Sequence, residues 1–136
     1  MFEATVKSAM EYAQQNKVEE WVHEFLCGEG NNKPFSDGLK LKKRQFTPPA
    51  LMKLDLLTRI HGPESDMKYR VVGEEHIGYF RLKIEEIEQR YAAGNWDMPP
   101  LIVQCCDEIY ELNDGNHRIE ALKNLKIDEY WVILWK

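Results

Sequence analysis

The sequence predicts an α+β fold, in which a small mixed sheet packs against helices and is preceded by a mainly helical segment. Two kinds of pattern support this prediction. Apolar residues recur at helical spacing, most clearly over Val18–Leu26. Short apolar runs over Leu101–Cys106 and Trp131–Trp135 instead fit buried strands.

Length and composition indicate one soluble globular domain of 136 residues, with 43% hydrophobic and 30% charged residues. Residues 1–65 are expected to form the mainly helical extension and residues 66–136 the core. No apolar run could cross a bilayer, and Met1–Thr5 has no features of a secretory signal. Three cysteines, two of them adjacent, indicate neither a disulfide framework nor a zinc site. We therefore expect a cytoplasmic protein with no membrane partner.

The first elements are predicted to be two amphipathic helices. Thr5–Gln15 carries apolar residues on one side, and Val18–Leu26 follows with a stronger apolar stripe that Gly28 and Gly30 end. His23 falls on the polar side of the second helix and is interpreted as a surface histidine.

A loop and a basic segment come next. The composition of Asn31–Gly38 predicts a loop. Leu39–Arg44 alternates as a short strand would and contains four basic residues. These side chains could form a solvated sheet edge, or a patch that binds phosphates of a nucleotide or nucleic acid. The solvated interpretation is favoured because no aromatic residue interleaves the charges, and the net charge of −5 argues against general nucleic-acid binding.

The remaining elements follow from the same patterns. Thr47-Pro48-Pro49 resembles a helix start that would turn Leu51, Leu54 and Leu57 toward the core. Cys105 and Cys106 are expected to be buried in a central strand. The other predicted elements are strands at Tyr69–Val72, His76–Leu82, Glu108–Leu112 and Trp131–Trp135, a helix at Ile84–Ala93 closed by Gly94, and a helix containing Ile119, Leu122 and Leu125.

The turn Asp114–Arg118, between a predicted strand and a predicted helix, is the main functional candidate. Gly115 can adopt positive φ and leaves no side chain in the way of a bound group. The helix that begins there directs the positive end of its dipole at an anion such as phosphate. Arg118 would add a planar fork of donors, and His117 a donor or a base. The alternative is an ordinary turn, in which Asp114 or Asn116 caps the helix.

Residues from about Ile84 to Trp135 resemble the core of the ParB/sulfiredoxin-like superfamily. The resemblance rests on the order of the Ile84–Ala93 helix, Gly94, Pro99-Pro100, Leu101-Ile-Val103, Tyr110-Glu-Leu112, Asp114-Gly-Asn-His-Arg118, Glu120-Ala-Leu122 and Tyr130-Trp-Val-Ile-Leu134. It implies a ParB/sulfiredoxin-like fold that binds a nucleotide or a phosphorylated small molecule. ATP, ADP or CTP, with Mg²⁺, would be the ligand, and Gly115, Asn116, His117 and Arg118 would contact its phosphates.

Relatives within this superfamily imply different activities. Sulfiredoxins use a cysteine where this chain has Asn116, so that activity is not expected. ParB proteins carry a later DNA-reading module, for which this chain has no room after its last strand. The turn is most similar to Asp-Gly-His-His-Arg of the free serine kinase group, which implies phosphotransferase or nucleotidase chemistry. His117 and Asp114 would then be the catalytic candidates.

Three hypotheses about function remain open. In the first, a nucleotide-binding phosphotransferase or hydrolase needs a base beside the acceptor, for which Glu74, Glu75 and Glu85 are candidates by position. In the second, the protein is a ParB-like nuclease or DNA-associated protein that uses the basic Leu39–Arg44 segment. In the third, it is a non-catalytic interaction protein that retains the fold. The nucleobase, the acceptor and the oligomeric state are left open.

Overall fold

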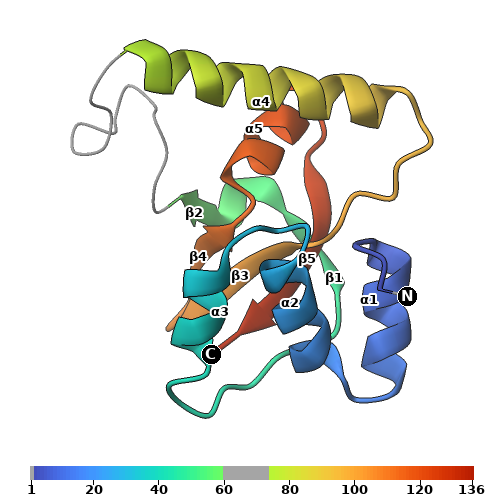
Figure 1. Cartoon of the computed structure of the whole chain (residues 1–136), viewed down its shortest axis with the longest axis vertical. Helices are drawn as coiled ribbons and strands as arrows, with labels where there is room; N and C mark the ends of the chain where they lie inside the picture. Colours follow the sequence, from blue (N-terminus) through green and yellow to red (C-terminus); the bar gives the residue numbers. More distant parts are fainter. Residues whose placement is uncertain (1, 60–73) are drawn as a thin grey trace.

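The computed structural model describes residues 2–59 and 74–136 (Figure 1). The predicted α+β class is confirmed. The elements in chain order are α1 (Val6–Gln14), α2 (Val18–Cys27), α3 (Lys33–Leu39), β1 (Ala50–Lys53), the 3₁₀ helix η1 (Leu54–Leu56), β2 (Leu57–Arg59), α4 (Glu74–Ala92), β3 (Leu101–Cys106), β4 (Ile109–Asp114), α5 (Asn116–Asn124) and β5 (Glu129–Trp135).

The five strands form one mixed sheet in the order β1-β5-β3-β4-β2. β1 pairs with β5 and β3 with β4 in antiparallel fashion, whereas β3 with β5 and β2 with β4 are parallel. The prediction that Leu101–Cys106 is a central strand is confirmed. Leu101, Ile102 and Val103 are fully buried because helices cover both faces of the sheet at this end of β3.

The sheet is curled because of how β1 and β2 are connected. These strands occupy its two opposite edges, yet only the three residues of η1 join them. From Lys53 to Leu57 the chain can span at most about 14 Å, whereas five flat strands would be about 19 Å across. The edges must therefore curve toward each other. Leu54, 2% exposed, lies in the connection, and its N–H donates to the carbonyl of Asp128 over 2.8 Å.

Two apolar clusters cover the two faces. On one face α2 packs with Trp21, Val22 and Leu26 against Ile102 and Ile133. On the other face, apolar residues of α5 pack against apolar residues of β3, β4 and β5. They are Ile119 and Leu122 of α5, Leu101 and Val103 of β3, Leu112 of β4 and Val132 of β5. α4 packs on α5 and lies across that side of the molecule (Figure 1). Because successive side chains of β3 point to opposite faces, Ile102 packs in the cluster of α2, whereas Leu101 and Val103 pack in the cluster of α5.

The hairpin between β3 and β4 sets the position of the next turn. Asp107 and Glu108 both have positive φ, 46° and 71°, as the two central residues of a type I′ turn require. This turn pairs Cys106 with Ile109, and the ladder continues to Asp114 opposite Ile102, with one irregularity between Ile102 and Val103. The end of β4 is thereby held beside the start of β3.

Several local predictions are wrong. The helix expected after Thr47 is instead β1, η1 and β2, so the N-terminal half supplies both edge strands of the sheet. Residues 33–38, expected as loop, belong to α3, with Pro34 in its first turn. His76–Leu82, expected as a strand, lies within α4. The strand expected at Tyr69–Val72 lies outside the described residues.

The basic segment is also not a strand. α3 ends at Leu39, and Lys40, Lys42 and Lys43 follow as exposed side chains. Arg44 turns back, so that its Nε donates to the carbonyl of Leu39 and its Nη2 to that of Gly38, each over 3.3 Å. It thus satisfies carbonyls at the C-terminus of α3, where a cation is favourable. In the part of the chain that the structure describes, no helix is long and apolar enough to cross a membrane.

Three side chains differ in burial from expectation. Cys105 and Cys106, expected to be buried, are only half-buried at the far end of β3. His23, expected on the surface, has a side chain only 15% exposed, and its Nδ1 lies 2.6 Å from Oγ of Ser36 on α3. The short helix α3 covers a histidine that the pattern of α2 alone placed in water.

Candidate anion-binding site at the start of α5

Gly115 forms the turn between β4 and α5 with φ 119° and ψ 24°. Side chains of L-residues rarely adopt this conformation. A Cβ built on Gly115 would lie only 2.5 Å from Cδ2 of Leu101. The space expected to receive a bound group on that side is therefore filled by Leu101. The glycine is needed for its backbone conformation and for close packing of the turn on β3.

α5 begins directly after this glycine. Gly115 is its N-cap residue and provides no side-chain cap, and its carbonyl accepts the first helical hydrogen bond, from Ile119 N over 2.8 Å. Neither Asp114 nor Asn116 occupies the capping position that the ordinary-turn alternative assigned to them. Asn116 and His117 form the half-buried first turn. The dipole of α5 places partial positive charge at this turn.

Arg118 is 8% exposed and holds the turn to the segment that enters β3. Its Nη1 donates to the carbonyls of Pro99 over 2.6 Å and Pro100 over 3.0 Å. Its Nη2 donates to Oδ2 of Asp114 over 2.9 Å. Its guanidinium carbon also lies 5.4 Å from the ring centroid of Phe25. Three hydrogen bonds within the protein thus orient the group that the sequence predicted as a phosphate clamp.

Burial has the largest influence on the pKa of Arg118 and lowers it, while the neighbouring Asp114 carboxylate raises it. The guanidinium remains charged at any ordinary pH. Asp114 compensates this charge across four residues, a spacing that brings the two side chains onto the same side of the turn. That spacing was the sequence signal for the ion pair, and it was not used in the prediction.

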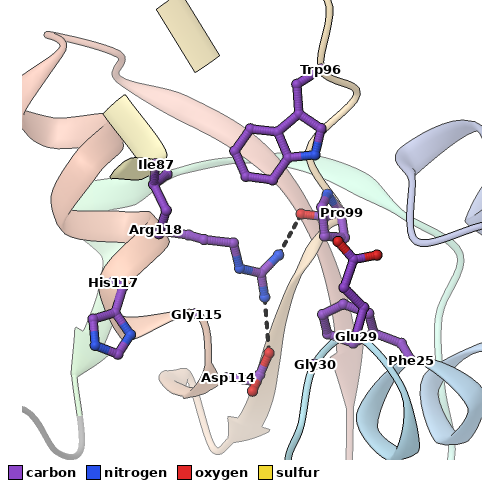
Figure 2. A pocket seen from close by; sticks show the side chains of 10 residues that line it. All are labelled: Phe25, Glu29, Gly30, Ile87, Trp96, Pro99, Asp114, Gly115, His117 and Arg118. Atoms are coloured by element: carbon purple, nitrogen blue, oxygen red, sulfur yellow. Dashed lines mark hydrogen bonds and ion pairs between the residues drawn. The ribbon is translucent and has the colours of Figure 1, made fainter. Parts of the chain in front are cut away.

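A cavity of about 210 Å³ opens beside this turn. Figure 2 shows that Asp114, Gly115, His117 and Arg118 line one part of it. The remaining walls are Phe25 of α2, Glu29 and Gly30 from the turn that follows α2, Ile87 of α4, and Trp96 and Pro99 from the α4–β3 connection. The structure therefore brings together four of the predicted residues, without Asn116, and adds two aromatic rings and a second carboxylate.

Trp96 and Glu29 were missed by the sequence prediction. Arg90 links them: its guanidinium carbon lies 4.0 Å from the ring centroid of Trp96, and its Nη1 lies 3.9 Å from Oε1 of Glu29. These residues are distant in sequence and belong to no motif. Their association depends on packing between the end of α2 and the region after α4, and no local pattern could have indicated it.

The acid/base candidates Glu74, Glu75 and Glu85 belong to α4. Glu85 is exposed on this helix and is not among the described residues that line the cavity. Glu74 and Glu75 form the beginning of α4. Within residues 2–59 and 74–136, no group of three or more His, Cys, Asp or Glu side chains is arranged to hold a metal ion. His117 and Asp114 are thus the predicted catalytic residues that line the cavity.

Comparison with known proteins identifies no family from sequence. No protein-family model matches the chain, and no curated protein matches it. Among solved structures, it is similar to the C2221 form of a Pnob8-like ParB-N domain, with 18% sequence identity and a TM-score of 0.45. The similarity covers 68% of this chain and 30% of that chain, so this chain spans about a third of the matched one.

Proposed function

We propose that this protein binds the phosphate group of a small nucleotide at the start of α5. The observation that carries the proposal is that the N-terminal residues of α5, among them His117 and the oriented Arg118, line one cavity. The dipole of α5 favours an anion there. Because Arg118 is already bonded to Asp114 and two carbonyls, its contribution is to position the turn.

We further propose that any chemistry at this site is phosphoryl transfer or phosphate hydrolysis. His117 lies in the first turn of α5 and can donate to a phosphate oxygen or move a proton. Mg²⁺ is commonly held by one or two carboxylates together with the phosphates of its nucleotide. Asp114 is the carboxylate nearest the turn, but its Oδ2 also accepts from Arg118. Binding is therefore the primary proposal and catalysis a separate one.

Isothermal titration calorimetry tests the binding proposal with inorganic phosphate, AMP, ADP, ATP and CTP, each with and without Mg²⁺. We expect saturable binding of at least one nucleotide, weakened in His117→Ala and unchanged in Lys43→Ala, which alters an exposed residue after α3. Absence of binding by every compound contradicts the proposal. Release of phosphate that stops in His117→Asn, while the nucleotide still binds, would support catalysis.

A further inference from the structure

Trp96 presents an aromatic ring to the cavity beside α5. The residue is half-buried, lies between α4 and β3, and is one of the cavity walls (Figure 2). The guanidinium carbon of Arg90 lies 4.0 Å from its ring centroid. A cation over an indole is attracted by the negative face of the ring, so Arg90 restrains the orientation of Trp96.

The chain directly after Trp96 is attached to three different elements, α1, β5 and α5. Asp97 accepts hydrogen bonds from the backbone N–H groups of Val6 and Lys7, over 3.2 and 3.0 Å, at the start of α1. The carbonyl of Met98, a fully buried residue, accepts from the hydroxyl of Tyr130 over 2.7 Å. The carbonyls of the next two residues, Pro99 and Pro100, accept from Arg118.

These attachments mean that the position of Trp96 is determined before any ligand arrives. A binding group held in place in the free protein loses little conformational entropy when its ligand binds. The same Arg118 that positions the start of α5 also fixes the backbone three and four residues after Trp96. The two ends of the cavity are therefore held at a constant separation.

We propose that Trp96 stacks against the base of the nucleotide whose phosphate lies at the start of α5. This inference rests on the proposed function and specifies its ligand. Bases of every kind have a π face, so stacking on an aromatic side chain contributes affinity without requiring a particular base. A ribose between base and phosphate would connect the two ends of the cavity.

The charges around the cavity select a nucleoside monophosphate over a polyphosphate. Two carboxylates, Glu29 and Asp114, line the walls, and the charge of Arg118 is compensated by Asp114. Glu29 is in turn paired with Arg90, and Arg118 is the only Lys or Arg among the described wall residues. The walls therefore offer no further Lys or Arg to neutralise a second or third phosphate. The volume of about 210 Å³ lies below the usual range of sites for drug-sized ligands, roughly 300–1,000 Å³. A small cavity of this kind favours a ligand with one phosphate over a ligand with two or three.

Calorimetry on the full chain with AMP, CMP, ADP, adenosine and ribose 5-phosphate separates the contributions of base and phosphate. We expect AMP and CMP to bind about tenfold more tightly than ribose 5-phosphate, which lacks a base. ADP should bind no more tightly than AMP. In Trp96→Leu the mononucleotides should fall to the affinity of ribose 5-phosphate, whose own binding should not change, and Trp96→Phe should restore most of the difference.

The outcomes distinguish the two proposals. Equal affinity of the wild-type protein for AMP, CMP and ribose 5-phosphate overturns the stacking inference but leaves phosphate binding intact. A difference between AMP and ribose 5-phosphate that persists in Trp96→Leu also overturns it. Tighter binding of ADP than of AMP contradicts the selection of monophosphates. If none of the phosphate compounds binds, both the proposed function and this inference are wrong. Equal affinities in the wild-type protein overturn the stacking inference even if Trp96→Leu does not fold.

Discussion

Arg118 and Asp114 form an ion pair across the β4–α5 turn, with 2.9 Å between Nη2 and Oδ2 and side chains that are only 10% and 14% exposed. Arg118 extends this pair to the carbonyls of Pro99 and Pro100. The cationic residue nearest the candidate anion site is therefore also a structural cross-link between α5 and the segment entering β3.

Arg118→Ala should destabilise the protein by about 3–5 kcal/mol, because it leaves the Asp114 carboxylate without its partner and two carbonyls without a donor. Urea unfolding followed by circular dichroism measures this loss. Lys43→Ala, at an exposed position, should change stability by less than about 0.5 kcal/mol. A stable Arg118→Ala protein would show that the cross-link is dispensable. Because the variant is expected to be unstable, His117 and Trp96 are better positions at which to test binding.

Gly115→Ala should destabilise more than Gly94→Ala, and the comparison separates two effects. Both glycines have positive φ, but a Cβ on Gly94 meets nothing within 4 Å, whereas one on Gly115 would strike Leu101. Gly94→Ala should therefore cost about 1 kcal/mol of backbone strain. Gly115→Ala should cost about 3 kcal/mol or more through strain and overpacking together. Thermal unfolding of the two variants tests the order, and equal losses would contradict the Leu101 contact.

Asp97→Ala should reduce stability by about 1 kcal/mol, since its carboxylate accepts from two N–H groups in the first turn of α1. Hydrogen exchange should show faster exchange of the Val6 and Lys7 amides than in the wild type. Asp128→Ala, at another exposed aspartate, serves as the control because it keeps the backbone carbonyl that accepts from Leu54. Unchanged exchange at Val6 and Lys7 would mean that this cap does not form.

Stability should fall as the pH falls below about 6.5 because of His23. Burial, followed by the charge of Lys40, lowers the pKa of His23 below its ordinary value of 6.5, while Glu19 and Asp37 oppose that change. A lowered folded-state pKa means that the unfolded chain takes up the proton first, so acidification favours unfolding. The loss should begin near pH 6.5 and level off below the folded-state pKa.

The His23→Gln variant isolates this effect. Urea unfolding from pH 8 to pH 5 gives the free energy of unfolding of the wild type and of the variant. The wild-type value minus the variant value should decrease as the pH falls through 6.5. Other ionisable groups contribute similarly to both proteins and largely cancel. Parallel stability curves for the two proteins over this range would refute the role of His23.

Elements dominated by local chemistry were predicted from the sequence. α1 forms within the expected Thr5–Gln15 segment, where the structure adds a capping box between Thr5 and Ser8, and the apolar stripe of α2 is buried as expected. β3, apolar on both sides, is the central strand. For the candidate site, residues 114–118 were found together because they are adjacent in the chain and their residue types specify a turn that leads into a helix.

The segment Ala50–Arg59 shows why other predictions failed. Its leucines recur at helical spacing, but Leu51 is 52% exposed while Leu54 and Leu57 are buried. The segment instead forms two strands: β1 pairs with β5 at one edge of the sheet, and β2 pairs with β4 at the opposite edge. Hydrogen bonds to strands more than fifty residues away decide the conformation, and no property of the segment itself reports them.

The sequence alone determined which segments have a helical or an extended preference, and that a glycine turn carrying His117 and Arg118 lies between a strand and a helix. These properties depend on neighbours within a few residues. Only the tertiary structure decided that Arg118 is bonded to Pro99, Pro100 and Asp114, and that Trp96 and Glu29 complete the cavity. The physical reason is that burial and ion pairing depend on which distant segments the curled sheet brings into contact.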